Sequence, residues 1–218
     1  MTKNKNINTS KFWDKQFEDE FDIVFAKKSG YYRWRDEQFA HIGNAVPAIP
    51  GIKLLDYGCG LGHFCRYLES RYIFAEVAGT DFSPKAIELA QKIAPGLFLF
   101  VSNSKQVDTK DESFGFISCI ELIEHLKKPE DLLKEFARVI EKKGVVALTT
   151  PIFNPEKGVK SHDHVQEYTP ITLKALCEKY FDDVDISIPF YKYNPTTRVA
   201  IQTEWQMAIC RKPKKNAK

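Results

Sequence analysis

The chain has 218 residues, of which 43% are hydrophobic and 28% are charged, with a formal net charge of +3 at pH 7. This length suits one domain with a full hydrophobic core, and we divide it into a disordered tail at 1–10, one domain at 11–211 and a basic tail at 212–218. The small net charge disfavours a nucleic-acid partner. No apolar run approaches the roughly 18 residues of a membrane span, and the polar N-terminal segment lacks the apolar core of a signal peptide. The five cysteines are scattered and odd in number, so we expect reduced thiols and a cytoplasmic enzyme.

Residues 11–50 are expected to form two helices that act as an N-terminal lid, because aromatic and apolar residues recur there at helical spacing, with an interruption at Ser29-Gly30. Short β-rich runs then alternate with helical patterns: strands at 52–57, 75–80, 97–101, 115–120 and 145–150, and helices at 62–70, 84–93 and 130–141. This alternation predicts an α/β fold with a doubly wound, mostly parallel sheet. A helix at 170–179 is followed by strands at 184–189 and 204–210, joined through a loop at 194–197. Two strands without a helix between them predict an antiparallel hairpin at the edge of a seven-stranded sheet.

Three glycines at alternate positions follow the first predicted strand: Gly58, Gly60 and Gly62. A buried strand that leads through a glycine-rich turn into a helix lets a ligand approach the backbone where any Cβ would collide, and the helix start offers unpaired N–H groups. Asp81 ends the next apolar run, where its two oxygens can accept from both hydroxyls of a ribose. Ser83 is the better N-cap for the following helix, which leaves Asp81 for a ligand. The pattern predicts a nucleoside-cofactor site, and His63, at a position where a dinucleotide fingerprint has glycine, disfavours NAD.

These residues resemble the motifs of class I S-adenosylmethionine-dependent methyltransferases, from about residue 53 to residue 151. In that family an acid ends the first strand before G-x-G-x-G, which Asp56 and the three glycines reproduce without a gap, and Asp81 matches the acid that binds the ribose hydroxyls. Phe82 is expected to pack on the adenine face. The family usually has an aspartate near the adenine amino group, whereas this chain has Asn103 there, followed by Ser104. The resemblance implies S-adenosylmethionine as the cofactor.

A second group of candidate residues follows the fourth predicted strand in the sequence E-x-x-E-H: Glu121, Glu124 and His125. If the chain turns helically there, the three side chains share one face at the carboxyl edge of the sheet, where substrates bind. We assign Glu121 to the cofactor pocket, and Glu124 and His125 to catalysis. The sequence also resembles the metal-binding stretch of ubiquinone-pathway O-methyltransferases and of small-RNA 3′-terminal 2′-O-methyltransferases. Relatives with the same glutamate-histidine pair work without metal, so we favour a metal-free site over one that holds Mg²⁺, and no metal ligands are assigned.

His164, in the loop after the fifth predicted strand, is the second candidate base because this loop lies above the sheet edge. For Tyr32 and Arg33 two interpretations stay open: a lid whose arginine reaches the methionine carboxylate, and an amphipathic helix whose aromatics join the core. The residues together predict O-methylation of a small molecule such as a sugar, a sugar nucleotide or a quinone precursor, with His125 or His164 as base. The alternatives are an RNA-terminal 2′-O-methyltransferase, an NAD-type oxidoreductase and a non-catalytic cofactor-binding subunit. No membrane partner is expected, and the oligomeric state is left open.

Overall fold

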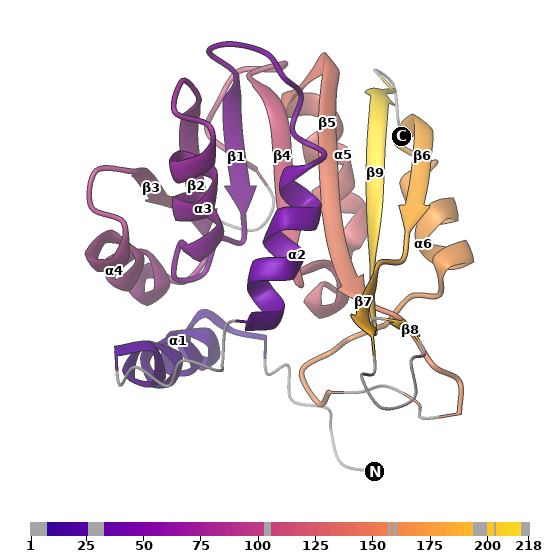
Figure 1. Cartoon of the computed structure of the whole chain (residues 1–218), viewed down its shortest axis with the longest axis horizontal. Coiled ribbons are helices and arrows are strands. Elements are labelled where there is room, and N and C mark those ends of the chain that lie inside the picture. Colours follow the sequence, from indigo (N-terminus) through magenta and orange to yellow (C-terminus); the bar gives the residue numbers. More distant parts are fainter. Residues whose placement is uncertain are drawn as a thin grey trace.

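The structure, a computed structural model, describes residues 8–25, 33–102, 106–156, 158, 161–193, 200–202 and 204–214. Its centre is a seven-stranded sheet with the order β3-β2-β1-β4-β5-β9-β6 (Figure 1). The strands of this sheet are β1 Lys53–Tyr57, β2 Glu76–Asp81, β3 Phe98–Val101, β4 Phe114–Ile120, β5 Ile140–Pro151, β6 Phe181–Ser187 and β9 Trp205–Pro213. Six of the strands in this described sheet are parallel, and β9 is antiparallel to both of its neighbours. The mostly parallel, doubly wound sheet predicted from the sequence is confirmed.

The predicted C-terminal hairpin is present, but its later strand takes the inner position. Strand β9 lies between β5 and β6, because its residues 206–210 are buried whereas β6 carries exposed acidic residues that suit the sheet edge. Arg211 of β9 pairs with Asp185 of β6 at 2.9 Å. A separate two-stranded sheet, β7 Phe190–Tyr193 and β8 Ala200–Gln202, was not predicted, and the expected loop at 194–197 lies outside the described residues.

Helices cover both faces of the sheet: α2 Arg33–Gly43, α3 His63–Arg71 and α4 Pro84–Ile93 pack on one face, and α5 Pro129–Val139 and α6 Pro170–Cys177 pack on the other. Side chains that alternate along the strands divide the core between these faces. Leu54 and Phe116 belong to the cluster beneath α2, α3 and α4, and Leu55 and Ile117 belong to the cluster beneath α5 and α6. The remaining long helix, α1 Ser10–Phe25, lies across the carboxyl ends of the strands and packs on α4 (Figure 1). The two predicted N-terminal helices are therefore present.

Most observed element boundaries lie close to the predicted ones, and the largest shift is at the start of β5. Helix α5 ends at Val139 and the chain continues directly into β5 at Ile140, whereas the sequence pattern predicted a helix to 141 and a strand from 145. The exposed residues 141–143 hid this part of the strand because they lack the apolar character of a buried one.

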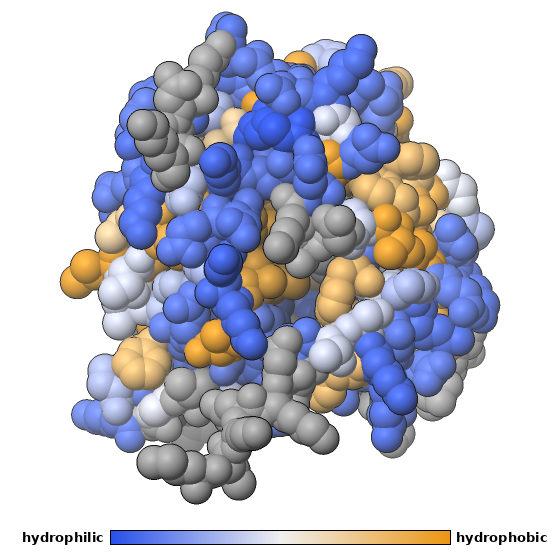
Figure 2. All heavy atoms as spheres, turned by 180° about the vertical axis from the view of Figure 1, so that it is seen from behind, coloured by the Kyte–Doolittle hydropathy of each residue, from blue (hydrophilic) through white to orange (hydrophobic). Residues whose placement is uncertain are grey.

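The surface seen from behind is mostly hydrophilic, with apolar side chains in smaller groups (Figure 2). Among the exposed large hydrophobic residues is Phe98 of the edge strand β3, with 69% exposure. All five cysteines are buried, and none of them forms a disulfide. In the described ranges, no helix combines the length and the apolar character that a membrane crossing demands. The cytoplasmic location stays a prediction.

Candidate functional site

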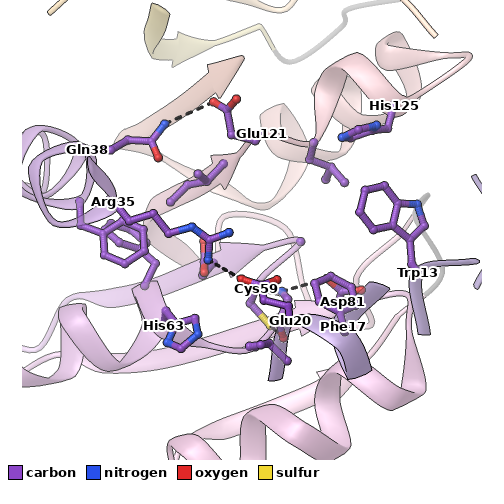
Figure 3. A pocket seen from close by; sticks show the side chains of 18 of the residues that line it. Trp13, Phe17, Glu20, Arg35, Gln38, Cys59, His63, Asp81, Glu121 and His125 are labelled. Atoms are coloured by element: carbon purple, nitrogen blue, oxygen red, sulfur yellow. Dashed lines mark hydrogen bonds and ion pairs between the residues drawn. The ribbon is translucent and has the colours of Figure 1, made fainter. Parts of the chain in front are cut away.

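A cavity of about 260 Å³ lies at the carboxyl ends of β1, β2 and β4, and α1 and α2 close it (Figure 3). Residues from five parts of the chain line this cavity: Gly58 and Gly60 after β1, Asp81 and Phe82 at the end of β2, Glu121 after β4, Trp13 and Phe17 on α1, and Arg35 and Gln38 on α2. The carboxyl edge of a parallel sheet is where open α/β folds bind ligands. The fold therefore brings the glycine-rich turn, Asp81 and Glu121 to one site, as the sequence predicted.

The glycine-rich turn has a backbone that side chains rarely adopt. Gly58, Gly60 and Gly62 have φ angles of 78°, 51° and 74°. These angles lie in the left-handed region, which glycine enters without steric cost. A Cβ on Gly60 would also lie 2.8 Å from Cε1 of Phe17. In this structure an aromatic ring of α1 approaches the turn closely, and the approach of a ligand to its backbone stays a prediction.

Asp81 is buried, with 6% exposure, and each of its oxygens already accepts one backbone hydrogen bond. Oδ2 accepts from Gly60 N at 3.0 Å, and Oδ1 accepts from Ser83 N at 2.9 Å. Burial raises the pKa of this carboxyl, and the backbone donors oppose the rise. The predicted N-cap is confirmed, because Ser83 Oγ accepts from Ala86 N at 2.9 Å. The sequence had suggested that Asp81 is free for a ligand, whereas both of its oxygens accept backbone hydrogen bonds. These two bonds orient the carboxylate, and each oxygen keeps a further lone pair that can accept from a diol.

The E-x-x-E-H segment does not form the single face that the sequence predicted. Only Ile123–His125 form a helical turn, a 3-10 helix labelled η1, and Glu121 precedes it with a left-handed φ of 50°. This backbone turns Glu121 toward α2, where its Oε1 accepts from Gln38 Nε2 at 3.3 Å (Figure 3). Glu124 and His125 instead face the loop that follows β5. The segment thus serves two separate parts of the site.

Glu124 and His125 form a compact group with His164. One ligand-capable atom from each of the three residues lies within 4.8 Å of the other two. His125 Nδ1 lies 3.1 Å from the carbonyl oxygen of Asp163, and His125 Nε2 lies 3.8 Å from Glu124 Oε1. Glu124 is 1% exposed and accepts from Thr150 Oγ1 at 2.8 Å. Burial raises the pKa of Glu124, and the Glu121 carboxylate adds to the rise, whereas burial lowers the pKa of His125.

The hydrogen bonds of this group fix the tautomer of His125. A carbonyl oxygen only accepts, so Nδ1 of His125 carries the proton toward Asp163 and Nε2 presents a lone pair to the group. His164 Nδ1 lies 2.6 Å from Glu167 Oε1, which holds its ring in the same manner. Two imidazoles and one carboxylate form a donor set that suits Mn²⁺, Fe²⁺, Co²⁺ or Zn²⁺ better than Mg²⁺. The chemistry of these side chains therefore suits a divalent ion, and it equally suits a histidine that acts as a general base.

Helix α1 closes the cavity beside this group. Trp13 and Phe17 line the cavity, and the Trp13 ring lies edge-on to His125 with 4.9 Å between ring centroids. Just before α1, Asn8 Nδ2 donates to the carbonyl oxygens of His125 at 3.2 Å and Asp163 at 2.8 Å. The start of the chain is thus tied to the two segments that carry the candidate bases.

Comparison with known proteins assigns the chain to a family. Residues 31–180 match the family model described as a methyltransferase domain. The chain belongs to this methyltransferase family. Together with the Rossmann-like sheet and the named relatives, the match shows a class I S-adenosylmethionine-dependent methyltransferase, and hence an enzyme.

The relatives of this methyltransferase include curated O-methyltransferases. It is 26% identical over 171 residues to the ubiquinone biosynthesis O-methyltransferase of Azoarcus sp., covering 69% of this chain and 72% of the relative. It is 30% identical over 106 residues to the mitochondrial ubiquinone biosynthesis O-methyltransferase of Schizosaccharomyces pombe, covering 46% of this chain but only 38% of that enzyme. Phosphoethanolamine N-methyltransferase 2 of Haemonchus contortus, solved with S-adenosyl-L-methionine, shares the fold with a TM-score of 0.69 and 14% identity, covering 98% of this chain and 61% of that one.

Several predicted residues of the methyltransferase site fall at or beyond the limits of the described structure. Tyr32, Asn103 and Ser104 lie outside the described residues, and Arg33 begins α2 without a described side chain. Phe82 lines the cavity as expected. Their contacts with the cofactor stay predictions.

The lining residues that were not among the predicted site residues include Trp13, Phe17, Arg35 and Gln38. Trp13 and Phe17 were visible as a pair four residues apart on a helix, but that spacing is also typical of core packing. Arg35 forms an ion pair with Glu20 of α1 at 2.8 Å. The sequence predicted a helical lid at 11–50, but it did not indicate which side chains of α1 would lie over the glycine-rich turn.

Asp56 provides a pH-dependent prediction. It is 2% exposed, and burial raises its pKa from 3.8 to about 7 although Ser118 Oγ donates to it at 2.7 Å. Because the folded pKa exceeds the unfolded one, the protonated group favours folding below the unfolded pKa, and this contribution is lost as pH rises toward 7. We expect the ligand-free wild type to lose about 2–3 kcal/mol of unfolding free energy between about pH 5 and pH 7.5 relative to Asp56→Asn, which urea titration at both pH values measures. Equal slopes in the two proteins would contradict this assignment.

Proposed function

We propose that this methyltransferase transfers the methyl group of S-adenosylmethionine to a hydroxyl of a small molecule. The observation that carries the proposal is the group formed by Glu124, His125 and His164 beside the cavity. A hydroxyl must lose a proton to become a good nucleophile, whereas a neutral amine does not, so adjacent imidazoles suit O-methylation. The names of the curated relatives support the same reaction class.

The donor half of the reaction depends on alignment. Methyl transfer from a sulfonium is an in-line displacement, in which positioning supplies much of the reduction in barrier. In our proposal the glycine-rich turn accepts the donor through its backbone, and Asp81 receives the ribose hydroxyls. The aromatic rings of Trp13 and Phe17 keep water from the reacting atoms.

The acceptor half depends on proton removal. His125 has a lone pair on Nε2 and a pKa lowered by burial, so its ring is neutral and able to accept a proton near pH 7. The Asp163 carbonyl bound to Nδ1–H stabilises the imidazolium that forms when Nε2 takes the hydroxyl proton. His164, whose ring lies 5.0 Å from that of His125 between centroids, is the alternative base.

A divalent ion is the competing use of the same three side chains. If bound by Glu124, His125 and His164, it would lower the pKa of an acceptor hydroxyl and orient it. We retain the metal-free form, because the lone pair on His125 Nε2 can take the hydroxyl proton without an ion.

Assays of methyl transfer test the proposal. The purified chain, incubated with methyl-labelled S-adenosylmethionine and panels of phenols, sugars and amines, is expected to give a labelled methyl ether and S-adenosylhomocysteine. Dialysis against a chelator is expected to leave the rate within about twofold of the untreated enzyme, since the proton passes to an imidazole. Labelled amines in place of ethers would refute O-methylation. A lost rate that Mn²⁺ or Co²⁺ restores would assign the histidines to a metal.

A further inference from the structure

Two of the buried thiols, Cys59 and Cys65, meet beside the glycine-rich turn. Cys59 lies in the turn itself, between Gly58 and Gly60, and Cys65 lies in the first turn of α3. A Cβ on Gly79 of β2 would lie 2.6 Å from Sγ of Cys65 and 3.1 Å from Sγ of Cys59, so both sulfurs meet over this one glycine. The two thiols also share a hydrogen bond. Their sulfurs are therefore already neighbours, which is the first requirement for a disulfide.

The two thiols differ in their access to small molecules and in their chemistry. Cys59 is one of the residues that line the cavity (Figure 3), whereas Cys65 is fully buried behind it. Their hydrogen bond acts to lower the pKa of Cys59 and to raise that of Cys65, so Cys59 is the sulfur that ionises first. Burial and the carboxylates of Asp56 and Asp81 together outweigh the bond at Cys59, so its pKa still lies above the ordinary value. Because the thiolate is the reacting form, we expect a slow reaction at Cys59 that sustained oxidant drives to completion.

A carboxyl group lies next to the inner thiol. Cys65 Sγ donates to Asp56 Oδ2 at 3.6 Å, and burial raises the pKa of Asp56 to about 7. A carboxyl with this pKa is partly ionised at neutral pH and can take the proton that a thiol loses. The group therefore comprises a thiol on the cavity wall, a second thiol bonded to it and a proton acceptor. A reversible thiol oxidation needs these three parts.

We propose that Cys59 and Cys65 form a reversible disulfide when hydrogen peroxide enters the cavity in the absence of the methyl donor, and that this bond prevents the donor from binding. The Cys59 sulfur attacks the peroxide: an S–O bond forms, the O–O bond breaks, and the hydroxide that leaves takes up the Cys59 proton and departs as water. Cys65 then attacks the sulfur of this sulfenic acid: the S–S bond forms, the S–O bond breaks, and the second hydroxide departs as water with the Cys65 proton, which passes through Asp56. Two thiols are oxidised, and one peroxide is reduced to two waters.

The new bond closes a loop that contains part of the glycine-rich turn. It draws the two sulfurs closer than their hydrogen-bonded contact, so the backbone between Cys59 and Cys65 must shift. Gly60 lies in this loop, and its N–H donates to Asp81 Oδ2 at 3.0 Å. The shift therefore disturbs both the turn and the carboxylate to which we assign the donor. The inference goes beyond the proposed methyl transfer and rests on its donor site. Because the coupling is reciprocal, a bound donor is expected to protect Cys59 from oxidation.

A mass measurement on the wild-type chain tests for the bond directly. Trypsin cuts after Lys53 and Arg66, so one peptide, 54–66, holds both cysteines and no other. After the full chain is treated with hydrogen peroxide and its free thiols are blocked, we expect this peptide to have lost two hydrogen atoms, and dithiothreitol to restore them. Calorimetry on the same samples is expected to show an affinity for S-adenosylhomocysteine that is at least about 10-fold weaker after oxidation and recovers after reduction. S-adenosylhomocysteine added before the peroxide is expected to slow formation of the bond.

A pair of variants assigns the effect to these thiols. Cys59→Ala removes the thiol that meets the oxidant, so its affinity for S-adenosylhomocysteine is expected to be the same before and after peroxide, whatever its starting value. Cys177→Ala is the matched control, because Cys177 is also buried, shares a hydrogen bond with Cys210 and does not line the cavity. The control is expected to lose affinity on oxidation as the wild type does.

Three results would overturn the proposal: a wild-type peptide 54–66 that keeps both thiols under peroxide, a bond that leaves the affinity unchanged, or a Cys59→Ala protein as sensitive as the wild type. The mass measurement uses no variant, so misfolding of Cys59→Ala does not affect it. The proposed function fails separately, because formation of the bond requires no acceptor. A chain that forms the bond and loses donor affinity but methylates no hydroxyl would keep the thiol pair and refute O-methylation.

Discussion

Replacement of Asp81 by asparagine is expected to weaken the binding of S-adenosylmethionine by at least about 100-fold, because charge-assisted hydrogen bonds to the ribose are lost. Both oxygens of Asp81 accept backbone bonds in the structure, from Gly60 N and Ser83 N. An asparagine side chain has one oxygen, so its amide nitrogen must face one of these N–H groups, donor against donor. The substitution therefore damages both the diol site and the turn that holds the donor.

Asp14 offers the matched control for this experiment. It lies on α1 and accepts hydrogen bonds from Ser83 Oγ and Lys85 N at the start of α4, but it does not line the cavity. Asp14→Asn is expected to keep the donor affinity within about threefold, because only contacts outside the cavity change. Calorimetry with S-adenosylmethionine compares the two variants. An Asp81→Asn protein that binds like the wild type, or an equal loss in both variants, would remove Asp81 from the ribose site.

The local structure that the sequence predicted correctly around the candidate site depends on neighbouring residues. Gly58, Gly60 and Gly62 adopt the left-handed angles that their residue type allows, and Ser83 caps the helix two residues after Asp81. The alternation of short apolar runs with helical patterns predicted the parallel sheet, because strands and helices differ in the spacing of their apolar residues. The conformational preferences of these residues agree with the order of strands and helices, so the sequence alone was sufficient to predict them.

The parts that sequence reasoning missed depend on contacts between distant residues. Glu121 leaves the expected face because its backbone N–H bonds to the Thr149 carbonyl on β5, which no helical spacing reveals. Trp13 meets His125 only because α1 crosses the strand ends. The same crossing lets Asn8 reach Asp163 over 155 residues of sequence. The position of Gln38 follows from the packing of α2 on the sheet, and its amide looked like any polar residue on a helix.

Replacement of His125 by alanine is expected to lower kcat by about 10²- to 10⁴-fold while the affinity for S-adenosylmethionine stays within about threefold of the wild type. His125 removes the hydroxyl proton in the proposed reaction, whereas Asp81 and the glycine-rich turn hold the donor. Because burial lowers the pKa of His125, the wild-type rate is expected to persist at pH values below the ordinary pKa of 6.5 for histidine. On the same preparation, single-turnover assays measure the rate of methyl transfer and calorimetry measures the affinity for S-adenosylmethionine.

His162→Ala is the matched control, because His162 is an exposed histidine of the same loop as His164 and lies outside the compact group. It is expected to retain the wild-type rate. A large loss in His164→Ala with little change in His125→Ala would move the base to His164, whose ring is held by Glu167 in the same way. Wild-type rates in both variants would show that neither imidazole takes the proton. The group would then have no catalytic part in the reaction, and the choice of a hydroxyl acceptor would lose its structural basis.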